Sequence, residues 1–112
     1  MHEFSIADAM LTTIREKLAP GQSVVAVHIT LGPLSGISSE SLEFCFSELA
    51  AQARLGTPAL VVNRTRARLR CSRCGGEYEV ADFHTACPSC GSLERVVCSG
   101  AEFTLDSIEV EE

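Results

Sequence analysis

Four of the six cysteines form two Cys-x-x-Cys pairs. Cys71 and Cys74 lie in CSRCG, Cys87 and Cys90 lie in CPSCG, and twelve residues separate the pairs. The first and fourth side chains of such a turn converge, and the glycine that follows permits its tight backbone. Two such turns bring four thiolates into the tetrahedron that Zn²⁺ prefers. We therefore predict a closed, structural zinc site that replaces the apolar core a lobe of roughly 25 residues cannot build.

Two other readings of these pairs stay open from the residues alone. The thiols could be redox-active or form disulfides, although the chain shows no signal sequence. The site could also hold iron, as in a rubredoxin-like electron carrier, but one Tyr and no Trp offer few aromatic side chains to cover it. His84 could share a metal with the cysteine pairs. We expect Cys45 to be a small core residue of a helix, and we predict no role for Cys98.

The first residues, MHEFS, are a second candidate metal site. With histidine at position two, the terminal amine of Met1, the deprotonated His2 amide and the His2 imidazole can form fused chelate rings around one metal. Glu3 can add its amide or its carboxylate. Such nitrogen-rich, planar coordination favours Ni(II) or Cu(II) over zinc. The alternative is a start of the chain that is simply exposed to solvent.

The elements that position these residues follow from the apolar spacing. Ser5 and Asp8 predict the cap of a helix that ends before Pro20, with residues 1–4 as a lead. Ser38 or Ser39 caps a second helix. The helices bury two apolar faces: Ile6, Ala7, Met10, Leu11, Ile14 and Leu18, then Leu42, Cys45, Phe46, Leu49 and Ala53. Strands are expected at 24–32, with Val25, Val27, Ile29 and Leu31 on one side, at 59–69 and at 102–110.

This order of elements predicts an α/β fold. Two helices lie on a small mixed three-stranded sheet, and a four-cysteine zinc-ribbon lobe is inserted between its last two strands. The expected domains are 1–69 plus 100–112 for the α/β part and 70–99 for the zinc-binding part.

Charge and motifs exclude several classes of function. Arg64, Arg66, Arg68 and Arg70 alternate, so on one strand they share a face. A zinc-ribbon adaptor for nucleic acid or protein would use that stripe. The net charge of −6 argues against nucleic acid as the partner. The arginines could instead pair with acidic residues of the last strand: Glu102, Asp106, Glu109 and Glu111. No apolar run reaches the ~18–20 residues of a membrane span, which favours the cytoplasm. The sequence contains no recognisable nucleophile–base pair and no phosphate-binding loop, so nothing in it indicates an enzyme.

Three segments in this order resemble the HypA/HybF family of hydrogenase nickel-maturation proteins: MHEFS, GPLSGISSESLEFCF after a strand, and CSRCG…CPSCG. The likeness spans the whole chain and implies a nickel metallochaperone. It makes His2 the principal nickel ligand, assisted by the Met1 amine and Glu3, with the four cysteines holding zinc. The implied partners are a HypB-type GTPase and the [NiFe]-hydrogenase large subunit, and the chain would be a monomer or weak homodimer. Ser38 and Ser39 depart from the acidic residue and proline common in the family.

Overall fold

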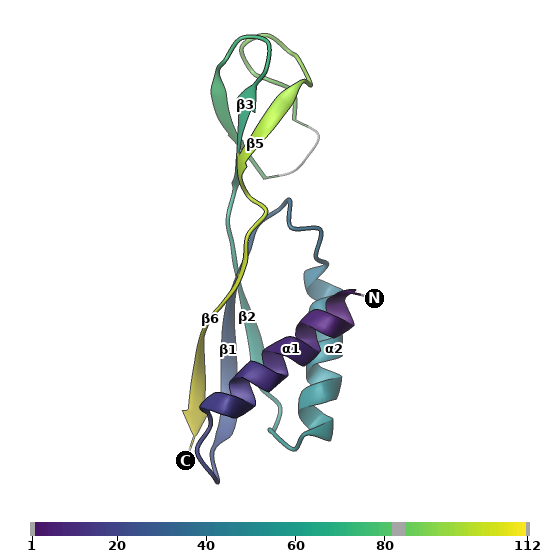
Figure 1. Cartoon of the computed structure of the whole chain (residues 1–112), viewed down its shortest axis with the longest axis vertical. Helices are drawn as coiled ribbons and strands as arrows, with labels where there is room; N and C mark the ends of the chain where they lie inside the picture. Colours follow the sequence, from purple (N-terminus) through teal and green to yellow (C-terminus); the bar gives the residue numbers. More distant parts are fainter. Residues whose placement is uncertain (1, 82–84, 112) are drawn as a thin grey trace. The chain divides into compact units, whose positions relative to one another are not determined.

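The structure of this chain is a computed structural model that describes residues 2–81 and 85–111 (Figure 1). Within these residues, two helices and six strands follow one another. In order they are α1 (His2–Lys17), β1 (Ser23–Leu31), α2 (Ser39–Gln52), β2 (Ala59–Arg64), β3 (Ala67–Cys71), β4 (Glu77–Val80), β5 (Arg95–Ser99) and β6 (Phe103–Glu111). The strands form two three-stranded sheets, ordered β2-β1-β6 and β4-β3-β5.

The chain divides into two compact units. The first contains Met1–Ile29, Ile37–Val62 and Leu105–Glu112, and the second contains Thr30–Gly36 and Asn63–Thr104. The second unit therefore includes more of the chain than the cysteine segment, because the loop after β1 and the start of β6 pack with it. The assignment of nickel to one expected domain and zinc to the other stays a prediction.

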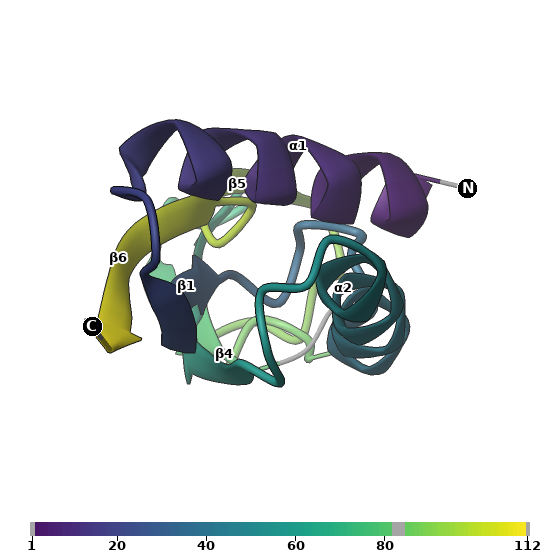
Figure 2. The same ribbon diagram turned by 90° about the horizontal axis from the view of Figure 1, so that it is seen from below.

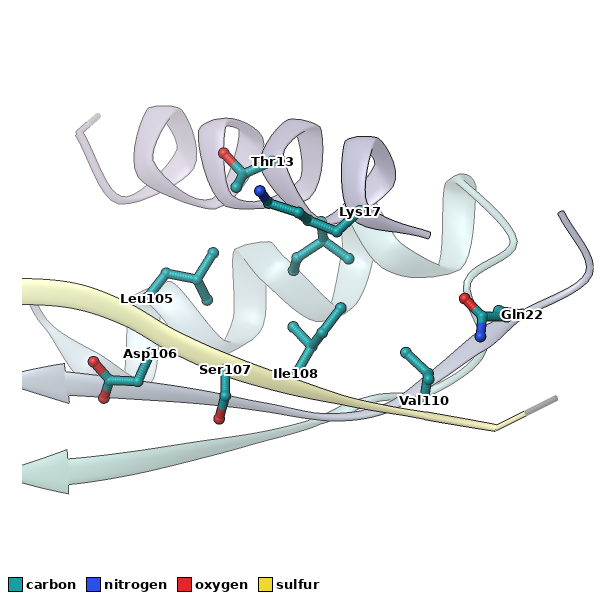
Figure 3. A pocket seen from close by; sticks show the side chains of 9 residues that line it. Thr13, Lys17, Gln22, Leu105, Asp106, Ser107, Ile108 and Val110 are labelled. Atoms are coloured by element: carbon teal, nitrogen blue, oxygen red, sulfur yellow. The ribbon is translucent and has the colours of Figure 1, made fainter. Parts of the chain in front are cut away.

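Helix α1 packs against α2, and both lie on the same side of β1 and β6 (Figures 1 and 3). The buried residues of α1 recur at helical spacing: Ala7, Met10, Leu11 and Ile14. In α2 the buried residues are Leu42, Cys45, Phe46 and Ala50. Most of the two predicted faces is thereby confirmed, including Cys45 as a core residue. Figure 2 shows α1 crossing the end of α2 rather than running parallel to it.

The structure corrects two details of this unit. Helix α1 begins at His2, so residues 2–4 belong to its first turn and Ser5 is not its cap. In β1, Val27, Ile29 and Leu31 are buried as predicted, but Val25 is 47% exposed. Val24 and Ala26 are buried in its place, so the side-chain phase of β1 changes between Ala26 and Val27.

The strand predicted at 59–69 is two strands in two sheets. Strand β2 ends at Arg64, and β3 begins at Ala67 and pairs antiparallel with β4 and β5. Thr65 lies at the break, where its N–H donates to the Leu31 carbonyl at 3.2 Å and its hydroxyl donates to the Glu102 carboxylate. These bonds hold the chain while it passes from one sheet to the other.

The expected pairing of the arginine stripe with the last strand is therefore wrong for Arg68. Its guanidinium lies 3.3 Å from Glu77 and 3.5 Å from Glu79, both on β4. Arg68 and Arg70 do share the exposed face of β3, as strand alternation predicts.

The predicted fold class is confirmed: an α/β fold with two helices, small sheets and a four-cysteine lobe inserted between β2 and β6. Within residues 2–81 and 85–111, neither helix combines the length and apolarity that crossing a bilayer requires.

Candidate metal sites

The four predicted cysteines meet in the second unit. The sulfur atoms of Cys71, Cys74, Cys87 and Cys90 all lie within 4.8 Å of one another. Two of the separations are 3.5 Å, from Cys71 to Cys90, and 3.7 Å, from Cys74 to Cys87. Four sulfurs around one zinc at about 2.3 Å stand about 3.8 Å apart, so these separations match a tetrahedral zinc site. They are much longer than the ~2.05 Å of a disulfide bond.

Both Cys-x-x-Cys turns have the same backbone hydrogen bonds. In the first, the Cys71 N–H donates to Gly76 at 2.8 Å and the Gly75 N–H donates to Cys71 at 2.9 Å. In the second, Cys87 donates to Ser92 at 2.9 Å and Gly91 donates to Cys87 at 2.8 Å. Gly75 and Gly91 have φ of 78° and 75°, a left-handed conformation that strains any residue with a Cβ.

The turns also favour the thiolate form of their first cysteines. The pKa of the Cys71 thiol is lowered to about 6, mainly by the backbone N–H of Cys74 and also by the N–H of Arg73, which together outweigh the opposing effect of burial. In the second turn, the N–H groups of Cys90 and Ser89 lower the pKa of the Cys87 thiol in the same way. Thiolates are the form that binds metal, so the turns favour that form for Cys71 and Cys87. For Cys74 and Cys90 a backbone N–H also acts to lower the pKa, but hydrogen bonds to the other sulfurs and burial outweigh it, so the pKa of Cys74 is raised and that of Cys90 is raised to about 11.

A small apolar cluster surrounds the first cysteine of each turn. Cys71 and Cys87 are buried, whereas Cys74 and Cys90 are exposed. The cluster consists of Ala67, Leu69, Cys71, Tyr78, Val80 and Cys87, with Leu34 packed against it. Among the described residues of the lobe, this cluster is too small to be a stable core by itself, which fits a structural zinc on these cysteines.

The second candidate site lies at the start of α1. The His2 side chain is 63% exposed and its Nε2 lies 3.1 Å from the Glu3 carboxylate, which is only 14% exposed. The first N–H groups of an α-helix have no partner within the helix, so the ladder of α1 does not require the His2 amide. Met1, the third predicted ligand, lies outside the described residues.

Glu3 also contacts the second helix. The backbone N–H of Ser38, the N-cap residue of α2, donates to Glu3 Oε2 at 3.2 Å. This bond lowers the pKa of the Glu3 carboxyl, burial opposes the shift, and nearby His2 adds to it. The partial positive charge at the start of α2 favours the same carboxylate. One Glu3 oxygen therefore ties the first turn of α1 to the first turn of α2.

A hollow of about 300 Å³ adjoins this contact. It lies between the two helix starts and is lined by Glu3, Glu40, Ser41, Phe44 and Cys45. Phe44 is 68% exposed there. Sequence reasoning predicted the capping role of Ser38, which the structure confirms through its hydroxyl, 3.3 Å from the Ser41 N–H. It missed the contact of Ser38 with Glu3, because nothing in a sequence relates residues 35 positions apart.

Two residues considered in the sequence remain, Cys98 and His84. Cys98 is exposed on β5 and does not belong to the cysteine cluster. His84 lies outside the described residues, so its predicted share in a metal site stays a prediction.

The fold and the cysteine cluster define a small α/β metal-binding protein with a four-cysteine lobe. The chain belongs to the HypA family: residues 1–110 match the family described as "Hydrogenase/urease nickel incorporation, metallochaperone, hypA". It is 40% identical to the hydrogenase maturation factor HypA of Chlorobium luteolum, covering 100% of this chain and 97% of that protein. It is 38% identical to the HypA of Geobacter metallireducens, covering 99% and 100%.

Two solved structures have the same fold. The solution structure of the Ni metallochaperone HypA from Helicobacter pylori matches with a TM-score of 0.59 at 19% identity, covering 96% of this chain and 95% of that one. A second solution structure of a HypA protein matches with a TM-score of 0.61, also at 19% identity, covering 97% and 95%. The expected family is confirmed by the sequence matches, and the fold by these structures.

Proposed function

We propose that this chain is a nickel metallochaperone that serves the maturation of a [NiFe]-hydrogenase in the cytoplasm. It takes up Ni(II) as cargo through the Met1 amine, His2 and Glu3. Cys71, Cys74, Cys87 and Cys90 hold a structural zinc ion. Family membership over residues 1–110 carries this proposal, and the exposed imidazole of His2 beside Glu3 supports the assignment of the nickel site.

The chemistry of the two sites supports a division between a retained and a transferred metal. Four thiolates complete the coordination of zinc and leave no position for exchange. The N-terminal site instead offers nitrogen donors and a carboxylate, the harder ligands that suit Ni(II). Because the His2 side chain is largely exposed, a partner protein can approach the metal and take it over.

Delivery involves two partners in this proposal. A HypB-type GTPase supplies the energy and timing of transfer, and the hydrogenase large subunit receives the nickel. The chain itself acts as a carrier and not as an enzyme, so any GTP hydrolysis belongs to the partner.

Metal analysis of the purified, untagged protein tests this function. We expect about one zinc per chain as isolated, and about one Ni(II) bound on titration without loss of zinc. Iron in the cysteine site, with its visible absorption, would replace the proposal with a rubredoxin-like electron carrier. Zinc without any nickel uptake would leave a zinc-ribbon adaptor as the better function.

A further inference from the structure

An open groove runs between α1 and β6 in the first unit. It has a volume of about 500 Å³ and lies beside the last turns of α1, at the opposite end of that helix from His2. Figure 3 shows Leu105, Ile108 and Val110 pointing from β6 toward the helix, with Lys17 above them. Asp106 and Ser107, between Leu105 and Ile108, also line the groove. The apolar part of the floor therefore comes from Leu105, Ile108 and Val110, and the slip in apolar spacing between Leu105 and Ile108 spans two consecutive exposed residues.

The groove follows an open edge of the sheet. In the order β2-β1-β6, β6 is the last strand, so among the described residues one side of its backbone has no neighbouring strand. The N–H and C=O groups of such an edge can pair with a strand from another chain. A strand that pairs there can place every second side chain in the groove, which is how proteins bind extended peptides by β-augmentation.

The charge of β6 indicates what kind of strand fits. Glu109 and Glu111 alternate with Ile108 and Val110, so they lie on the face opposite the groove. Both glutamates are exposed, and Glu109 Oε2 lies 2.6 Å from His28 Nε2 on β1. A second copy of this strand would place acidic residues next to acidic residues, which is unfavourable. A basic strand would place opposite charges there.

We propose that the edge of β6 and the groove beside it bind an extended segment of another protein whose apolar and basic side chains alternate. The apolar side chains fill the groove over Ile108 and Val110, and the basic ones face Glu109 and Glu111. The aliphatic part of Lys17 forms one wall. This surface uses neither candidate metal site, so the inference goes beyond the proposed function and does not depend on it.

A capped peptide, acetyl-Lys-Val-Arg-Val-Lys-Val-Arg-amide, is the probe for this surface. It is titrated into the full, zinc-loaded chain without nickel, and binding is measured by calorimetry and by amide chemical shifts. Lys17 is the only lysine of the chain, so ¹³C-methylation places a single side-chain signal beside the groove. We expect shifts in that signal and along β6.

Matched substitutions on the two edges of the sheet locate the binding site. Val110 on β6 is 40% exposed and Val61 on β2 is 42% exposed. Val110→Asp puts a charge at the groove and should weaken the peptide about tenfold, a loss of about 1.4 kcal/mol. Val61→Asp adds the same charge at the other edge and should leave the affinity within about twofold of the unsubstituted chain.

Four results would overturn the proposal. A peptide of the same sequence with every backbone nitrogen methylated keeps its charge but has no backbone N–H to pair along the edge. Equal binding of that peptide would mean attraction of a basic peptide to an acidic chain and not strand addition. No measurable binding of the unmodified peptide, or equal loss in the Val61→Asp chain, would also reject the site. Dimerisation through β6 would assign the groove to a second copy instead.

Discussion

Glu3 and Glu102 show how single carboxylates organise the backbone of this protein. Glu3 accepts the N–H at the start of α2. Glu102 accepts the Thr65 hydroxyl and, at 2.9 Å, the Gly100 N–H. The surrounding backbone is close-packed, because a Cβ built on Gly100 would stand 2.5 Å from the Cβ of Ala67. Each carboxylate thus holds segments that are distant in sequence.

The hydrogen bonds of Glu102 should lower the pH at which its carboxyl group titrates. The Thr65 hydroxyl lowers its pKa below the ordinary value of 4.5, and the Gly100 N–H acts in the same direction. A lowered folded pKa adds stability that is fully present above pH 4.5 and is lost as the pH falls through the folded value. We expect Glu102→Gln to lower the thermal midpoint at pH 7, with a difference that shrinks below pH 4.5. A carboxyl ¹³C midpoint for Glu102 at or above 4.5 would contradict this account.

At the scale of elements, local sequence predicts what local interactions decide. Apolar residues spaced three and four apart predict the buried faces of α1 and α2, and the two Cys-x-x-Cys turns predict the cysteine cluster, because spacing alone brings those side chains together. The break at Thr65 could not be predicted, since the bonds that hold it come from Leu31 and Glu102. Strands β4 and β5 have only four and five residues, too few for a clear pattern.

The cap of α2 can be tested by removing one hydroxyl. Ser38→Ala leaves the backbone N–H for Glu3 but removes the acceptor for the Ser41 N–H. It should lower the free energy of unfolding by about 1 kcal/mol, measured by chemical denaturation. Ser47→Ala, at an exposed position within the same helix, is the control and should be neutral or slightly stabilising. Equal effects of the two changes would mean that Ser38 is not the cap.

The cysteine lobe should depend on its metal as a whole element. Cys74→Ser removes one of the four sulfurs, so zinc should be lost and amide exchange should increase throughout β3, β4 and β5. Cys98→Ser removes an exposed thiol outside the cluster and should keep the full zinc content. Retained zinc in Cys74→Ser, or lost zinc in Cys98→Ser, would show that the ligands are assigned wrongly.

The same substitution separates the two units at the scale of the whole molecule. The helices bury their own apolar residues in the first unit, whereas the cysteine cluster lies in the second. Circular dichroism of Cys74→Ser should therefore keep most of its helical signal. If the helices unfolded together with the lobe, the first unit would not be stable without zinc.

The most direct test of the proposed carrier concerns the terminal amine. If the amine, the His2 amide and the His2 imidazole bind Ni(II) together, one extra residue before Met1 converts the amine into an amide and removes a chelate ring. Calorimetry of zinc-loaded protein should then show severely weakened Ni(II) binding in the extended chain and none at this site in His2→Ala, with zinc content unchanged in both. Equal Ni(II) affinity in the extended and unextended chains would mean that the amine is not a ligand, and equal affinity in His2→Ala would place the nickel site elsewhere.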